Sequence, residues 1–524
     1  MPKQERILLW STAAGTLVLR ALLFFRYRFD ADEQHHLHVV WGWTDGLVQY
    51  RDYFDNHAPL FHLSMAPLLW LLTAAGGERP DVLLWMRAPM LLLFAVVVWG
   101  AYELGRRLYD ERIGLWAAAL LALFPPFFLK SLELRTDNLW NALWILALVG
   151  VVRGWRPFAI GLILGCALAV SLKTILLIAS TAVAAALVAF FVNGWRPKAR
   201  ALVAGLLGFA MVPAALAAFF AASGAWDALV YCNITFNGAL ARTRDNLWVG
   251  RAIFPFTAAG LLWLAWRFRH TAHPWRYFFA VTIGVYTVTL AGFWILISPR
   301  DFLPLMPLGA IFAAAAIASL REPLRVFGTA ALLCVVALWY YADHFADKTA
   351  WHTTMMEQAL RLTHPGEPIL DLKGETIYRR RPFYYAFEYI TRAQMAHGMI
   401  RDTVAADVVR TRTHVAQADG PMWPPQARAF LSENFLNVGR LRASGQALQT
   451  DGSFTIAVPG EYVVISEFGE AHGTLDGSPY TGARSLAPGA HRFQRAVPGQ
   501  ALAVLWAPAF QRGHSPFHLR DTTF

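Results

Sequence analysis

The residues of this chain that are best suited to chemistry gather in one short segment, residues 29–61. Its sequence, FDADEQHHLHVVWGWTDGLVQYRDYFDNHAPLF, holds six carboxylates and four histidines. The segment follows an apolar run at residues 7–25, which is long enough to cross a bilayer because about 20 apolar residues are needed. Ionisable side chains held beside a membrane mark a functional site. The segment is therefore predicted to form the catalytic face of a membrane enzyme.

Asp32 and Glu33, just after this apolar run, are the candidate catalytic carboxylates. A carboxylate here could accept a proton from an acceptor hydroxyl or amine during group transfer, as a general base. Asp and Glu are also favoured at helix N-termini, so a solvated helix start is the alternative explanation. Asp30 competes with Asp32 for the catalytic role.

Asp137 lies in a second candidate motif, SLELRTDN, which reaches the same membrane face two spans later. Two carboxylates from separate loops on one face suit an acid–base pair, or a pair that orients an acceptor. Asp137 or Asn138 could instead be the N-cap of a helix that begins near Leu139.

Two cations on the same face are candidate partners for a phosphate group. Lys173 interrupts a long apolar stretch, where a charge is costly unless it serves a purpose. It could hold the phosphate of a lipid-linked substrate, or it could be a turn lysine that extends its amine to the interface. Arg300, in SPRDFLPLMP, suits bidentate phosphate contact, but an arginine at the start of an interfacial helix is an equal explanation.

The histidines of the segment allow several interpretations. His35, His36 and His38 resemble metal ligands, and His35 and His38 could share a helical face with Asp32 one turn back. The cluster lacks HExxH or a comparably specific zinc spacing. Hydrogen bonding to a substrate is therefore favoured, no cofactor is expected, and a divalent metal is the less favoured alternative. His57 is expected to contact substrate or phosphate, or else only to make the loop polar.

The composition places these candidates in a polytopic membrane protein with a soluble tail. Of the 524 residues, 56% are hydrophobic and 15% are charged, whereas about 25% charged residues are usual in soluble domains. The apolar runs continue to Tyr341 and thin out after it. The net charge of +11 does not indicate a nucleic-acid partner, because much of the excess lies in short loops between spans, as the positive-inside rule expects.

Eleven transmembrane spans are predicted, at residues 7–26, 82–103, 112–129, 138–152, 157–171, 174–192, 200–222, 251–268, 275–297, 302–320 and 323–342. The run 59–75 would be a twelfth, but its prolines and histidine suit a helix lying along the interface. With eleven spans, the short basic loops all lie on the cytoplasmic side. The first outer loop, residues 27–81, then faces the other side together with the remaining candidate site residues and the C-terminus.

The chain is expected to divide into a transmembrane domain, residues 1–342, and two soluble regions. Residues 343–445 mix helical periodicity with short strand candidates such as PILDL, which predicts a small α/β or α+β layer. Residues 446–524 contain SFTIAV, EYVVIS and ALAVLW between turn signals, which predicts a small antiparallel β-sandwich. The two soluble regions could equally be one domain.

Taken together, these motifs resemble the GT-C superfamily of membrane glycosyltransferases, with protein O-mannosyltransferases, lipid A aminoarabinose transferases and bacterial galacturonic-acid transferases as the nearest relatives. Segment 29–61 is similar to the family's first-loop pattern of Asp-Glu, then Gly…Tyr-Arg-Asp, then a Pro-Leu-aromatic end. SLELRTDNLW resembles the second-loop Asp motif, ALAVSLKTILL the short loop with a lysine, and SPRDFLPLMP the late Arg…Leu-Pro…Pro motif. They occur in the expected order and cover residues 1–342.

The resemblance implies a polyprenyl-phosphate sugar donor, inversion at the sugar carbon, and an active site on the periplasmic face of the inner membrane. Asp32 would match the catalytic Asp of the first loop, with Glu33 beside it, and Asp137 would match the second-loop Asp. Lys173 and Arg300 would be the phosphate-side contacts.

The rest of the first-loop pattern supplies further candidate substrate contacts, namely Tyr50, Arg51, Asp55 and His57. One departure concerns the last of these. Several relatives have Lys-Pro-Pro where this chain has His57-Ala58-Pro59, which leaves the role of His57 open.

The sequence thus predicts an inverting glycosyltransferase that moves a hexose or pentose from a polyprenyl-phosphate donor to a lipid, glycan or protein of the cell envelope. A transporter or flippase of lipid-linked glycans is the main alternative. It too would need a lysine and an arginine at membrane level, but not acidic motifs confined to one face. A third interpretation is a catalytically silent scaffold whose β-rich tail binds glycan.

Overall fold

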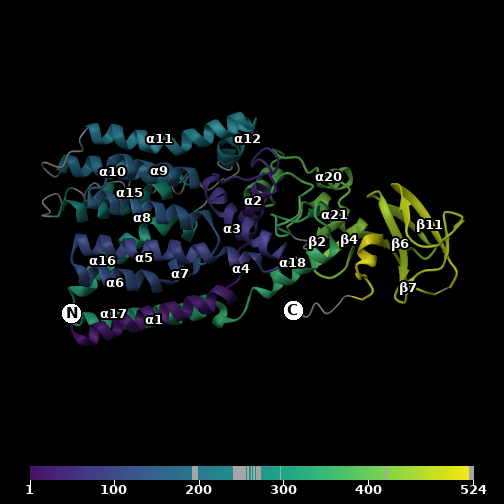
Figure 1. Cartoon of the computed structure of the whole chain (residues 1–524), viewed down its shortest axis with the longest axis horizontal. Helices are drawn as coiled ribbons and strands as arrows, with labels where there is room; N and C mark the ends of the chain where they lie inside the picture. Colours follow the sequence, from purple (N-terminus) through teal and green to yellow (C-terminus); the bar gives the residue numbers. More distant parts are fainter. Residues whose placement is uncertain are drawn as a thin grey trace.

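The structure, a computed structural model, describes residues 1–191, 199–239, 273–294, 297–418, 422–497 and 499–518, with a few positions between 255 and 266. Figure 1 shows an elongated molecule. A bundle of long helices forms one end, a mixed region of short helices and strands follows, and a β-rich region forms the other end. The predicted helical membrane domain and sheet-rich C-terminal region are both present.

The helices of the bundle, most of them long, run side by side (Figure 1). They are α1 (Lys3–Arg26), α5 (Ala88–Leu108), α6 (Glu111–Leu123), α7 (Pro125–Lys130), α8 (Thr136–Arg153), α9 (Pro157–Val170), α10 (Thr174–Phe191), α11 (Ala199–Ala222), α15 (Pro274–Phe293), α16 (Met306–Ala318) and α17 (Pro323–Tyr341). Elements at the end of the bundle that meets the soluble region are α2 (Ala31–Thr44), α3 (Leu60–Gly76), α4 (Val82–Met86), α12 (Trp226–Val230), η1 (Tyr231–Thr235), α13 (Phe236–Ala239) and η3 (Pro299–Leu305).

Among the described residues, seven helices are long and apolar enough to cross a membrane. They are Lys3–Arg26, Val82–Leu108, Thr174–Phe191, Ala199–Ala222, Pro274–Phe293, Pro299–Ala318 and Pro323–Tyr341. The predicted count of eleven is therefore not confirmed.

The difference in span count has physical causes. The predicted span 112–129 is divided, because α6 ends just before the two prolines that open α7. The span predicted at 138–152 is α8, which starts with polar residues, and the one at 157–171 is α9, which has only 14 residues. The predicted span 251–268 lies largely outside the described residues.

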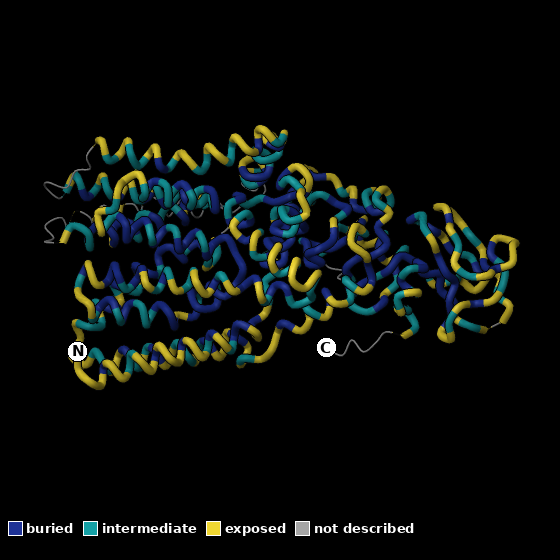
Figure 2. Tube along the Cα trace, viewed as in Figure 1, coloured by how far each residue is buried: buried dark blue, intermediate teal, exposed yellow. Residues whose placement is uncertain are grey.

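The outer helices present apolar side chains to their surroundings. On α11, five such side chains are more than half exposed: Leu202, Val203, Leu206, Leu207 and Met211. Figure 2 shows exposed positions recurring along α1 and α11, while buried positions concentrate where the bundle meets the soluble region. An exposed apolar surface of this kind is suited to lipid contact, as in a multi-pass membrane protein.

Helices α9 and α11 approach each other at glycines. A Cβ atom added to Gly161 would lie 1.9 Å from the carbonyl oxygen of Gly205, and one added to Gly165 would lie 2.4 Å from the carbonyl oxygen of Phe209. Small residues let membrane helices pack backbone to backbone, where van der Waals contact drives association. These glycines therefore fix the spacing of α9 and α11.

The soluble region contains two sheets. The larger has the order β1 (Ile369–Leu370), β2 (Val415–Gln417), β4 (Leu441–Ala447), β12 (Leu502–Trp506), β6 (Gly460–Ser466) and β10 (Arg484–Leu486), with β3 (Phe435–Asn437) on β4 and β7 (Gly469–Glu470) on β6. The smaller has the order β5 (Ser453–Ile456), β11 (Gly489–Arg495), β8 (Gly473–Leu475) and β9 (Ser478–Pro479). The helices here are α18 (Ala350–Leu362), α19 (Tyr389–Ala396), α20 (Val404–Arg410), α21 (Pro425–Asn434) and α22 (Ala507–Gln511), with the short η4 (Asp343–Phe345) after α17.

One sheet crosses the boundary predicted at residue 445. Strand β4 spans that position, pairing with β2 from the first soluble region and with β12 from the second. The strands predicted in SFTIAV, EYVVIS and ALAVLW are present as β5, β6 and β12. Side chains of both sheets share one hydrophobic core, so the two predicted regions are joined through a continuous sheet.

Replacing Gly161 with alanine is expected to destabilise the bundle by about 1–3 kcal/mol, the usual effect of overpacking. The added methyl group would meet the Gly205 carbonyl, so α9 and α11 would have to move apart. Thermal unfolding of the detergent-solubilised protein measures the change. Gly15→Ala in α1 is the matched control, because a Cβ atom there meets nothing within 4 Å. Equal melting temperatures for the two variants would contradict the close packing.

Candidate functional site

The N-terminus of α2 is closed by its own carboxylates. Asp30 is the N-cap, and its side chain accepts a hydrogen bond from the backbone N–H of Asp32 at 3.1 Å. The Glu33 side chain accepts from the backbone N–H of Asp30 at 2.9 Å, which completes a capping box. A capping box satisfies the free N–H groups at a helix start. It therefore fixes the first turn of α2 and the direction in which the Asp32 side chain points.

Glu33 is held in a buried ion pair with Arg87, the residue before α5. The guanidinium contacts both carboxylate oxygens, at 2.7 and 2.5 Å, and the Leu134 backbone N–H donates to the same carboxylate at 2.7 Å. The side chains of Glu33 and Arg87 are fully buried. The structure thus places Glu33 as an anchor that joins α2, α5 and the loop before α8.

Arg135 connects three of the acidic residues. Its Nη1 atom contacts Asp32 and lies 2.9 Å from the carboxylate of Asp30, and its Nε atom is 3.4 Å from Asp137. Two of the three predicted catalytic carboxylates, Asp32 and Asp137, are therefore held by a single guanidinium. Sequence reasoning did not select Arg135, although it lies two residues before Asp137 in the same motif.

Lys173 lies between two carboxylates. Its amine is 3.2 Å from Asp137 and 2.6 Å from Asp301. Asp301 is buried, and its side chain accepts hydrogen bonds from the backbone N–H and hydroxyl of Ser298. Asp301 was also missed, although it is the neighbour of the predicted Arg300.

Arg300 extends the same network in the other direction. Its Nη2 atom is 2.7 Å from Asp30 and 2.8 Å from Glu133. Its Nε atom donates to Glu133 at 3.1 Å, which leaves Nη1 out of these bonds. Glu133, fully buried, also pairs with Lys130 at 2.8 Å.

The soluble region contributes Lys373, whose amine is 2.8 Å from Asp32. Burial favours the neutral form of the Asp32 carboxyl, but the charges of Arg135 and Lys373 outweigh it and hold the pKa of Asp32 well below its usual range. Nothing in the sequence pointed to Lys373, because the tail carries no motif and lies far along the chain. We call the connected set the Arg135 network: Asp30, Asp32, Glu133, Arg135, Asp137, Lys173, Arg300, Asp301 and Lys373.

A buried arginine of α1 fixes the loop that carries Arg135. Arg20 donates to the hydroxyl and to the carbonyl oxygen of Ser131, each at 2.9 Å, and its guanidinium lies over the Phe94 ring. An arginine inside a membrane helix is costly unless it is paired. Here the hydrogen bonds from Arg20 to Ser131 hold the loop between α7 and α8 in place.

The other predicted substrate contacts lie outside the Arg135 network. Tyr50 is fully buried, and its hydroxyl donates to the His57 carbonyl oxygen at 2.7 Å. Arg51 is on the surface, pairing with Asp52 and donating to the Ser223 carbonyl oxygen. Both side chains hold the first outer loop in shape.

The histidines do not form the grouping expected from helical spacing. His38 bonds the Ile377 carbonyl oxygen through Nδ1 at 2.8 Å, whereas His35 lies against Asp55 at 3.2 Å. His57 contacts the same Asp55 oxygen through Nδ1, at 2.8 Å. Within the part of the chain that the structure describes, His35, Asp55 and His57 form a set whose ligand atoms are close enough to share a metal ion, all within 4.8 Å of one another.

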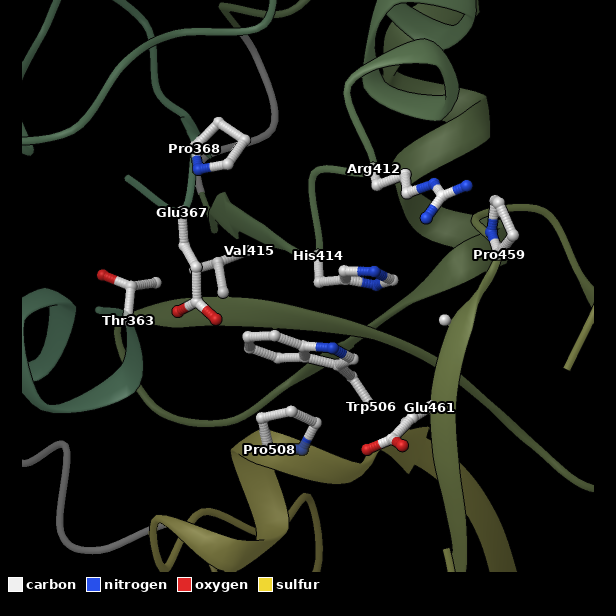
Figure 3. A pocket seen from close by; sticks show the side chains of 11 residues that line it. Thr363, Glu367, Pro368, Arg412, His414, Val415, Pro459, Glu461, Trp506 and Pro508 are labelled. Carbon is white, nitrogen blue, oxygen red and sulfur yellow. The ribbon is translucent and has the colours of Figure 1, made fainter. Parts of the chain in front are cut away.

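A separate cavity of about 280 Å³ lies in the soluble region (Figure 3). His414 stacks on Trp506 there, with ring centroids 4.9 Å apart and an interplanar angle of 5°. The carboxylates of Glu367 and Glu461 flank the tryptophan in Figure 3. No residue of the Arg135 network lines this cavity.

Comparison with known proteins supports the family resemblance. Residues 59–226 match the family described as dolichyl-phosphate-mannose-protein mannosyltransferase, and no curated protein sequence matches the chain. ArnT from Cupriavidus metallidurans in the apo state has a TM-score of 0.56 at 13% identity, with 82% of this chain and 97% of that chain covered. ArnT bound to undecaprenyl phosphate has a TM-score of 0.52 at 14% identity, with the same coverage of 82% and 97%. The chain is thus similar to these structures in fold, which is that of GT-C membrane glycosyltransferases.

Replacing Arg87 with methionine is expected to destabilise the protein by about 3–5 kcal/mol, because Glu33 would be left as an unpaired buried charge. Adding Glu33→Gln to this variant should restore much of the stability. Thermal unfolding in detergent measures both effects.

Arg79→Met is the matched control for the buried pair. Arg79 pairs with Asp81, and both side chains are more than a third exposed, so its loss should cost less than about 1 kcal/mol. A melting temperature of Arg87→Met equal to that of the control would show that the Glu33–Arg87 pair does not anchor the site.

Proposed function

Since the chain has the GT-C fold, we propose that it is an inverting glycosyltransferase of the inner membrane, working on the periplasmic side. It transfers a sugar from a polyprenyl-phosphate donor to a lipid, glycan or protein of the cell envelope. The observation that carries the proposal is the Arg135 network, in which carboxylates and cations from five separate segments converge where the bundle meets the soluble region. The similarity to ArnT, which was solved bound to undecaprenyl phosphate, supports the class of donor.

The cations of the network suit the leaving group of such a donor. As the glycosidic bond breaks, negative charge grows on the lipid phosphate, and fixed cations in a site with little water stabilise it strongly. Lys173 and Arg300 are each about one-fifth exposed or less, at 20% and 16% of the side chain. They are therefore accessible from the site yet held rigidly by Asp301, Asp30 and Glu133.

Asp32 is the best-placed general base. Its side chain is 29% exposed, compared with 17% for Asp30 and 6% for Asp137. An acceptor hydroxyl must come within hydrogen-bond reach of the base, and among these three carboxylates Asp32 offers the most access. Asp30 is engaged as a helix cap, and Glu33 is closed off by Arg87.

The low pKa of Asp32 requires that substrate binding prepare the base. A carboxylate held by Arg135 and Lys373 accepts a proton poorly, because protonation would break two ion pairs. A donor phosphate that draws these cations toward itself weakens both pairs and raises the pKa of Asp32. Donor binding and base activation are then one event.

Asp32→Asn is expected to lower sugar transfer by about 10²- to 10⁴-fold, the usual contribution of a general base. Transfer of labelled sugar from a polyprenyl-phosphate donor to envelope acceptors, in detergent, measures this. Any transfer by the wild-type protein also separates the proposal from a flippase, which makes no glycoside.

Asp45→Asn is the control, because Asp45 belongs to the same outer loop but pairs with Arg380 at the surface. It should keep wild-type activity. Full activity of Asp32→Asn, with the control unchanged, would move the base to Asp30 or Asp137.

The pH dependence of sugar transfer should show the rise in the Asp32 pKa that donor binding causes. The profile of kcat/KM reports the free enzyme, and that of kcat reports the enzyme–substrate complex. Because the Asp32 pKa lies well below its usual range in the free protein, the acid side of kcat/KM should stay flat through mildly acidic pH. The acid limb of kcat should lie at higher pH. Coincident acid limbs would contradict activation by the donor.

A further inference from the structure

Asp55 stands out among the buried carboxylates of this protein. Its side chain has no exposed surface, and its ion-pair partners among the described residues are His35, His57 and His62. The buried carboxylates of Glu33 and Asp301, by contrast, have Arg87 and Lys173. A buried charge is costly unless a cation compensates it, so Asp55 requires positive charge from its histidines or from a bound ion.

Hydrogen bonding determines which ring nitrogen of His35 carries the hydrogen, and therefore what faces Asp55. The Nδ1 atom of His35 is 2.9 Å from the Lys373 carbonyl oxygen, and a carbonyl oxygen only accepts, so Nδ1 carries the hydrogen. In the neutral ring, Nε2 is then a bare lone pair, and it faces a carboxylate oxygen of Asp55 at 3.2 Å. Two lone pairs at this distance repel each other unless a cation lies between them or the ring is doubly protonated.

The surroundings hold these groups as metal ligands are usually held. A metal-binding histidine commonly donates its other ring N–H to a carbonyl or carboxylate, as His35 does. The second oxygen of Asp55 accepts from Gln49 at 2.5 Å, which fixes the carboxylate plane. On the same side, the Nδ1 atom of His62 is buried without a hydrogen-bond partner among the described residues and lies 3.5 Å from Asp55.

The distances suit a small transition-metal ion. Around tetrahedral Zn²⁺, ligand atoms about 2.0–2.1 Å from the metal are about 3.3 Å apart. The Asp55 oxygen is 3.2 Å from His35 Nε2, close to this spacing, and 2.8 Å from His57 Nδ1, a hydrogen-bond distance. The partly exposed His57 ring would therefore move back by about 0.5 Å when an ion enters. Mg²⁺ and Ca²⁺ prefer ligand sets made of oxygen, whereas imidazole nitrogens favour the Zn²⁺ class.

Access to this cluster comes from two directions. The His57 side chain is 27% exposed. His35 lines a cavity of about 400 Å³ that it shares with Asp52, Arg380 and Arg381. An ion can therefore reach the ligands, and a fourth coordination position can face water.

We propose that His35, Asp55 and His57 form a binding site for a divalent transition metal of the Zn²⁺ class. The ion compensates Asp55 and fixes the His35 ring, whose Nδ1–H holds the Lys373 backbone. Since the Lys373 amine pairs with Asp32, the metal stabilises the contact between the soluble region and the Arg135 network.

The first test is metal content. The full-length protein, purified in detergent, is incubated with Zn²⁺ and separated from free ion by gel filtration. Its metal content is then measured by inductively coupled plasma mass spectrometry. About one metal ion per chain is expected. Replacement with Co²⁺ should produce visible absorption bands of a low-coordinate nitrogen–oxygen site. Wild-type protein without stoichiometric metal would overturn the proposal and leave a protonated histidine as the partner of Asp55.

Variants test which residues hold the ion. Asp55→Asn, which keeps the shape of the side chain, and His57→Ala, in a partly exposed position, should each weaken Zn²⁺ binding by at least about tenfold. A chelator should lower the melting temperature of the wild-type protein and leave that of either variant nearly unchanged.

His38→Asn is the matched control. His38 is on the same helix, but its ring contacts the Ile377 carbonyl, to which asparagine can also donate. This variant should bind metal as the wild-type protein does. Equal Zn²⁺ binding by all variants would place the metal elsewhere and overturn the proposal. If a variant does not fold, the metal content and Co²⁺ spectrum of the wild-type protein still decide the outcome.

Discussion

The site depends on one desolvated guanidinium, that of Arg135, placed among three carboxylates. Charges that leave water are tolerated only when oppositely charged groups surround them closely. The requirement acts in both directions here: Arg135 keeps Asp30, Asp32 and Asp137 ionised, and they keep Arg135 in place. Because the acidic partners come from the N-terminal ends of α2 and α8, far apart in the chain, the same balance of charge also positions α2 against α8.

The soluble region contributes to this balance of charge. Lys373 pairs with Asp32, and the backbone around it is held by His35 and His38, which bond the carbonyl oxygens of Lys373 and Ile377. The end of the bundle and the loop after β1 therefore form one surface. If Asp32 is the base, as proposed, the reaction takes place between the membrane domain and the soluble region, which both contribute ion-pair partners of Asp32.

The structure brings together four residues that the sequence singled out, and it surrounds them with partners that the sequence did not indicate. Asp32, Asp137, Lys173 and Arg300 were recognisable because each interrupts or borders an apolar run, where a charge needs a reason. Arg135 and Lys373 were missed because the importance of a cation depends on which carboxylates the fold brings to it. The helical domain with a sheet-rich tail was predictable from composition. The count of eleven spans is not confirmed among the described residues, since prolines and polar first turns shorten helices inside long apolar runs. Strand β4 pairs with strands on both sides of the boundary predicted at residue 445.

Asp30 has two tasks, and removal of its side chain abolishes both. As the N-cap of α2 it sets the orientation of the first turn, and as an acid it joins Arg135 to Arg300. Without its side chain, the first turn would unwind and the carboxylate of Asp32 would swing with it. Loss of activity on changing Asp30 could therefore arise from a reoriented Asp32, the proposed base, as well as from any chemistry of Asp30 itself. Asparagine, which keeps the cap and removes the charge, is the informative substitution.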